Sequence, residues 1–182
     1  MLVFEDNSTW RGRGVLSERF DDYNSLSEMF SNLIKETKEV GQVFKRLVST
    51  DRALIGQERY DLAEELEDLL GGYFFLYRKV LGGERDFCSR FCEGDCTFSV
   101  QFDGCSWSAE GILRREPVSG SFTDWFNSTL LKETSTLIRK FGTSLSDGLL
   151  DETEREAICR ELNEAVELVL RADKGLKKGD LS

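Results

Sequence analysis

Leu33-Ile34-Lys35-Glu36-Thr37 and Leu130-Leu131-Lys132-Glu133-Thr134 are the stretches that decide the fold, because they repeat one pattern 97 residues apart. Self-similarity at a fixed offset is the signature of a duplicated structural unit. The offset changes by one residue at places along the chain, as small differences in loop length between two copies would produce. Further matches are Trp10 with Trp107, Gly14 with Gly111, Phe44 with Phe141, Glu58-Arg59 with Glu154-Arg155, and Glu65-Leu66 with Glu161-Leu162. We therefore predict two copies of one module, at 1–83 and 100–179, joined by a cysteine-rich connector at 84–99.

Each copy begins with a pattern typical of a β-hairpin and continues with one typical of two helices. Apolar and polar residues alternate near 2–4 and 98–102, and Asp103-Gly104 is a favoured hairpin turn because glycine accepts a positive φ. Apolar residues then recur every three or four positions, as on one face of a helix. The sequence thus predicts an α+β, mostly helical fold, in which tandem duplication of a β-hairpin and an antiparallel helix pair gives pseudo-two-fold symmetry.

Three local features refine this expectation. Ser121 and Asp151 each precede an acidic residue by three positions, which is typical of a helix N-cap. The run Tyr73-Phe74-Phe75-Leu76-Tyr77 is apolar around more than one face, so its helix should pack on two neighbours at once. A two-stranded ribbon alone is marginal, so each hairpin should lie on the helices or pair with the other hairpin.

Composition narrows the classes of function. The chain has 182 residues, a net charge of -10 and no histidine, which removes the Ser-His and Cys-His catalytic arrangements. The acidic balance opposes direct contact with nucleic acid. No run of about 18 apolar residues is present, as a membrane span would require. We expect a non-enzymatic cytoplasmic protein that contacts neither nucleic acid nor a membrane.

The connector carries a group of cysteines whose thiols can be metal-bound, disulfide-bonded or free. Thiolates can bind zinc tetrahedrally, although the spacing here differs from paired Cys-x2-Cys knuckles. A disulfide within the connector and unbonded thiols are equally compatible with the spacing, and Cys159 is expected to be a packed thiol on a helix face. The candidate zinc ligands are Cys88, Cys92, Cys96 and Cys105.

Acidic residues are interpreted mainly as surface charge. Adjacent carboxylates on a helix point in different directions, and Glu154, Glu161 and Glu164 have the spacing of a solvated helix face. A small hydrolase that uses converging carboxylates and magnesium stays open as a further hypothesis, because sequence does not show which acids converge.

The second helical hairpin, about 130–176, resembles the C-terminal helices of phage CII-like regulatory proteins. The resemblance lies in the runs Lys140-Phe141-Gly142, Leu145-Ser146-Asp147-Gly148 and Glu161-Leu162, with Asp151 and Glu154 between them. It implies an oligomerising hairpin and a phage or mobile-element setting. It does not imply DNA binding, because no helix-turn-helix pattern precedes the hairpin.

These features favour a regulatory or protein-interaction function, in which an acidic and aromatic surface binds a basic partner protein or a second copy of the chain. A cysteine-based metal or redox sensor is the second hypothesis. The expected partner-binding residues are the large aromatic ones that the two copies do not share: Tyr73, Phe74, Tyr77, Trp125 and Phe126.

Overall fold

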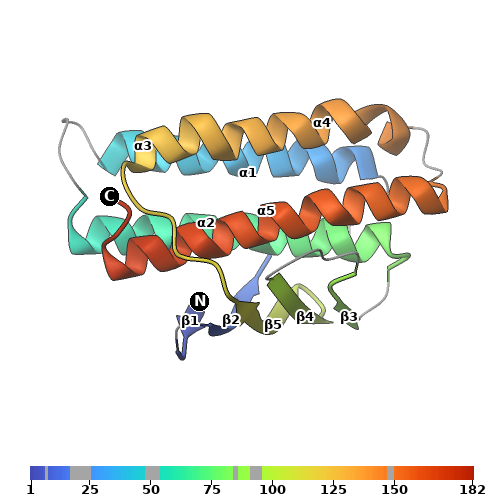
Figure 1. Ribbon diagram of the computed structural model, residues 1–182. Helices are drawn as coiled ribbons and strands as arrows, with labels where there is room; N and C mark the ends of the chain where they lie inside the picture. Colours follow the sequence, from blue (N-terminus) through green and yellow to red (C-terminus); the bar gives the residue numbers. More distant parts are fainter. Residues whose placement is uncertain (7, 17–25, 48–53, 84–85, 91–95, 147–149) are drawn as a thin grey trace.

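The computed structural model describes residues 1–6, 8–16, 26–47, 54–83, 86–90, 96–146 and 150–182. It has three layers (Figure 1): two helices on one side, two helices in the middle, and an antiparallel sheet. The outer helices are α1 (Leu26–Leu47) and α4 (Leu131–Ser146), and the middle ones are α2 (Gly56–Val80) and α5 (Glu152–Lys178). The chain is therefore α+β and mostly helical, as predicted.

A short helical segment leads into α4. It consists of α3 (Phe122–Trp125) and one π-helical turn, η2 (Phe126–Leu130), which continue into α4. The Ser121 side chain accepts a hydrogen bond from the Asp124 N–H at 3.4 Å, and Asp151 accepts one from the Glu154 N–H at 2.7 Å. Both predicted N-caps are confirmed.

The sheet consists of two hairpins that pair with each other and one added edge strand. Its strands are β1 (Leu2–Phe4), β2 (Thr9–Val15), β3 (Asp86–Cys88), β4 (Cys96–Asp103) and β5 (Ser106–Leu113), in the order β1-β2-β5-β4-β3. Gly104, in the tight turn between β4 and β5, has a φ of 60°, which fits the predicted Asp-Gly turn. The connector was expected to lie between the modules, but its described residues instead supply β3 and the start of β4.

Where the hairpins meet, each tryptophan lies opposite a glycine. Trp10 pairs with Gly111, and Gly14 pairs with Trp107. A Cβ atom on Gly14 would lie 2.8 Å from the Trp107 ring, so the bare glycine makes room for the indole. Gly12 lies opposite Ala109, a residue 97 positions later, which is also the offset of the repeat. This self-matching register is what a duplicated module would produce, and the duplication itself stays a prediction.

Helix α2 is packed on both sides, as its aromatic run predicts. Tyr77 stacks on Phe87 of β3 with ring centroids 4.9 Å apart, and Phe74 meets Trp107 of β5 edge-on at 5.3 Å. On its other side, α2 contacts α1 and α5. The core therefore extends from the sheet through α2 and α5 into the outer helices. No helix in the described part of the chain is long and apolar enough to cross a membrane.

Candidate metal centre

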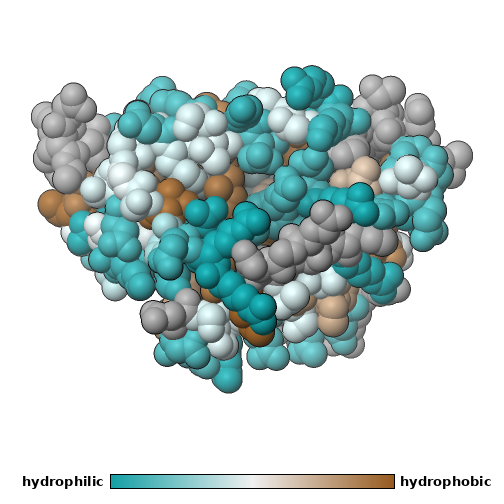
Figure 2. Space-filling model, viewed as in Figure 1, coloured by the Kyte–Doolittle hydropathy of each residue, from teal (hydrophilic) through white to brown (hydrophobic). Residues whose placement is uncertain are grey.

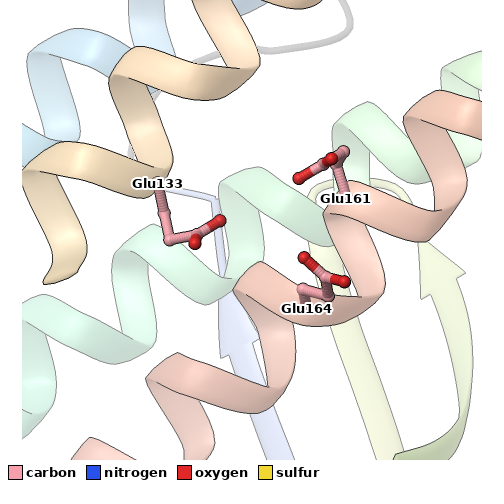
Figure 3. A group of neighbouring side chains, drawn as sticks. All are labelled: Glu133, Glu161 and Glu164. Carbon is pink, nitrogen blue, oxygen red and sulfur yellow. The ribbon is translucent and has the colours of Figure 1, made fainter. Parts of the chain in front are cut away.

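Three glutamates from two helices converge between α4 and α5 (Figure 3). Glu133 extends from α4 toward α5, where Glu161 and Glu164 lie one helical turn apart. One carboxylate oxygen from each residue lies within 4.8 Å of the others. Glu161 and Glu164 were expected on a solvated face. Glu164 is exposed, as expected, whereas Glu161 is largely covered and faces a third carboxylate from α4.

The glutamates are partly withdrawn from water. Glu164 is exposed, whereas Glu133 is half-buried and the Glu161 side chain is only 16% exposed. Burial raises the pKa of Glu133 above its ordinary value of 4.5, and the nearby carboxylates of Glu161 and Glu164 raise it further. Like charges held together in this way favour either a proton or a metal cation between them.

A lysine already contacts this group. Lys140 lies two helical turns after Glu133 on α4, and its Nζ donates to Glu161 Oε1 at 2.5 Å. The hydrogen bond and the charge of Glu161 raise the pKa of the lysine. The lysine side chain is 48% exposed, so the ion pair lies at the rim of the group.

A buried hydroxyl approaches the group from α2. Tyr73 is completely buried, and its hydroxyl makes no hydrogen bond of normal geometry. The neighbouring Thr134 hydroxyl donates instead to the Leu130 carbonyl, at 3.0 Å. Burial raises the pKa of Tyr73 to about 12, the Thr134 hydroxyl partly offsets this, and the Glu133 carboxylate adds to it. Tyr73 is therefore close enough for the charge of Glu133 to affect its pKa, but no hydrogen bond joins the two side chains.

The spacing of the oxygens suits a hard divalent cation. Mg²⁺ and Mn²⁺ at about 2.1 Å from each oxygen place octahedral ligands about 3.0 to 4.2 Å apart, and Ca²⁺ places them about 3.4 to 4.8 Å apart. Separations within 4.8 Å lie in the range that either kind of ion spans. No other set of three carboxylate or thiol ligands in the described ranges converges in this way.

The first helix pair carries acids at the matching positions. Glu36, Glu65 and Asp68 correspond to Glu133, Glu161 and Glu164, so the repeat itself held the signal for this site. Burial raises the pKa of Asp68 to about 6, and Glu65 contributes next. Burial also raises the pKa of Glu65, followed by the charges of Glu39 and Glu36.

The predicted four-cysteine site does not assemble from the described residues. Cys96 begins β4, whereas Cys105 follows its end, and eight residues of strand separate their backbones by about 23 Å or more. Zinc ligands at about 2.3 Å from the metal require sulfur atoms within about 4 Å of one another. Cys88 and Cys105 are free thiols, and Cys92 lies outside the described residues. Cys159 is buried, as expected, and burial raises the pKa of its thiol to about 11.

The predicted partner-binding aromatics lie mostly in the core. Tyr73, Phe74 and Tyr77 are 0% exposed and Trp125 is 6% exposed, while Phe126 is partly exposed beside Gly41. The reason is that α2 lies between two layers, so its second apolar face meets the sheet instead of solvent. Hydrophilic side chains cover most of the face seen in Figure 2.

A second group of charges is built into the core near β1. Lys177 Nζ donates to Glu67 Oε1 at 2.8 Å and to the Leu2 carbonyl at 2.7 Å, and it lies 2.9 Å from Asp173 Oδ1. Burial would raise the pKa of Glu67, but the bond and charge of Lys177 outweigh it, so this pKa is lowered. Burial raises the pKa of Asp173 well above its ordinary value, and Glu67 adds to this rise. This network fastens β1 to α2 and α5.

The same network borders a hollow of about 690 Å³ between β1, the start of α2 and the end of α5. Its walls combine apolar side chains with both signs of charge, including Phe4, Tyr60, Glu64 and Lys174.

Comparison of the chain with protein-family models, with curated proteins and with solved structures finds no match.

Proposed function

We propose that this chain is a divalent-cation-binding protein, whose ion is held between α4 and α5. The observation that carries the proposal is the convergence of Glu133, Glu161 and Glu164 oxygens within 4.8 Å. Two of the three carboxylates are also partly withdrawn from water, which strengthens their interaction with a cation. Three carboxylates without histidine or thiol form a donor set for Mg²⁺, Mn²⁺ or Ca²⁺ and not for zinc.

The ion would join two helices at a partly open surface. Because Glu164 is exposed, water or a partner's carboxylate would complete the coordination. Neutralising three like charges would remove their repulsion, so the folded state would gain stability as the ion binds. The expected protein-interaction function is compatible with this site and stays a proposal of weaker support, because most of the predicted contact residues are buried.

Manganese is a suitable probe, since its free and bound forms differ in electron paramagnetic resonance. We expect the purified chain to bind one Mn²⁺ at the α4–α5 centre and Glu164→Gln to weaken this binding at least tenfold. Glu65→Gln is the matched control, because it removes a half-buried glutamate from the other helix pair. The affinity should fall as the pH is lowered from 7 toward 4.5, since protons compete for Glu133, whose pKa is raised.

Two results would overturn the proposal. One is the absence of binding at millimolar Mn²⁺, Mg²⁺ and Ca²⁺. The other is binding that Glu65→Gln abolishes and Glu164→Gln leaves unchanged, because the ion would then lie at a different place.

A further inference from the structure

Lys140 places a positive charge at the rim of the α4–α5 centre. Its Nζ lies 2.5 Å from Glu161 Oε1. One of the three converging carboxylates is therefore already paired with a positive charge of the protein itself.

The contact is of a kind that is easily exchanged. The lysine side chain is 48% exposed, and exposed ion pairs contribute little to stability. A long side chain at the surface can move its ammonium into water at small cost. Loss of this pair would thus oppose ion binding only weakly, whereas an ammonium that stayed in place would repel a divalent ion at short range.

Resting on the proposed cation function, we infer that Lys140 is an internal counter-ion, which an incoming divalent ion displaces and which sets the affinity of the centre. In the absence of the ion it neutralises part of the cluster. When the ion arrives, Glu161 exchanges the ammonium for the metal, and Lys140 becomes a free surface lysine.

The neighbouring charges allow a matched control. Lys132 lies next to Glu133 and lowers its pKa through its charge, after Lys140 in size, and it is exposed on the same helix. Lys132→Gln therefore removes one positive charge near the cluster without removing the Glu161 contact. Lys140→Arg keeps the charge and the donor.

The experiment is Mn²⁺ titration of the full chain and of these variants, followed by electron paramagnetic resonance. We expect Lys140→Gln to tighten binding about twofold to fivefold, which is the scale of one exposed ion pair. Lys132→Gln should tighten it less, and Lys140→Arg should leave it near the unsubstituted value.

Each outcome decides a different point. Equal tightening by Lys140→Gln and Lys132→Gln would overturn the displacement role and leave only a general charge effect. Unchanged affinity of Lys140→Gln would overturn it as well. Absence of binding in all variants would overturn the proposed cation function itself.

Discussion

The two helix pairs carry acids at matching positions but arrange them differently. Between α4 and α5, three glutamate oxygens come within 4.8 Å, and Lys140 pairs with one of them. Between α1 and α2, Glu36 is 4% exposed while its counterpart Glu133 is half-buried, and buried Val43 stands where Lys140 would. The comparison shows that the same acid pattern converges in one helix pair and not in the described part of the other, so the pattern alone does not decide whether a candidate site forms.

In the sheet, by contrast, the two halves behave alike. Trp10 and Trp107 are both buried and both face a glycine across the β2–β5 junction. The residues that the two halves share therefore fall into two groups. The tryptophans and glycines build the sheet in the same way in both halves, whereas the acids of the helix pairs are arranged differently. Substitutions can test this division, beginning with the largest expected effect.

Removing either tryptophan should cost the most. We expect Trp10→Ala and Trp107→Ala each to lower the free energy of unfolding by about 3 to 5 kcal/mol, because each leaves a large cavity at the junction of the hairpins. Val15→Ala, at a 64% exposed position on β2, should change it by about 0.5 kcal/mol or less. Denaturant unfolding provides the measurement. A small effect at one tryptophan and a large one at the other would break the likeness of the two halves.

The charge network that ties the halves together should come next. Lys177→Met removes the cation that lies between Glu67 and Asp173 and leaves Glu67 only the more exposed ammonium of Met1, so we expect a loss of about 2 to 3 kcal/mol. Lys178→Met, one position later and exposed, should have almost no effect. Denaturation midpoints of both variants test this. Equal stability of the two would mean that the contacts of Lys177 add nothing to the stability of the fold.

Tyr73 should sharpen the contrast between the helix pairs. It belongs to the first half, the charge of Glu133 in the second half raises its pKa, and its counterpart on α5 is Val169. We expect Tyr73→Phe to leave Mn²⁺ binding nearly unchanged, because no hydrogen bond joins its hydroxyl to Glu133. Stability without the ion should stay equal or rise slightly, because a buried hydroxyl without a partner is removed. A tenfold loss of affinity would contradict this and make the hydroxyl part of the centre.

The smallest effect is a pH dependence in the first helix pair. The pKa of Asp68 is about 6 in the folded chain against an ordinary 3.8, so the folded state binds this proton more tightly than the unfolded state. Its contribution favours folding below about pH 4 and is lost as the pH rises through about 6. Asp68→Asn should therefore reduce the decline of stability over this range. Identical pH profiles of unfolding would contradict the shift.

Much of the fold could be predicted because its signals are local. The alternating stretches, the Asp103-Gly104 turn and the two N-caps each depend on a few neighbouring residues, and all of them appear in the structure. Strand β3 was missed because Asp86–Cys88 is too short for an alternating pattern and pairs only through β4.

The candidate site was missed for a different reason. Spacing along α5 puts Glu161 and Glu164 on one face, but it does not reveal what covers that face. The third ligand, Glu133, comes from another helix, so the packing of the bundle was needed. The aromatic run on α2 illustrates the same limit: two-sided packing was predicted and is confirmed, yet the second neighbour is the sheet of the same chain.

The two edge strands of the sheet affect how copies of the chain could associate. Each outer strand has three residues, Leu2–Phe4 on one side and Asp86–Cys88 on the other. Such short strands offer few open backbone groups to a strand from another molecule, which is how natural sheets resist fibril growth. If copies of this chain associate, they should therefore do so through side chains on the helices or on the open face of the sheet, and not by extending it.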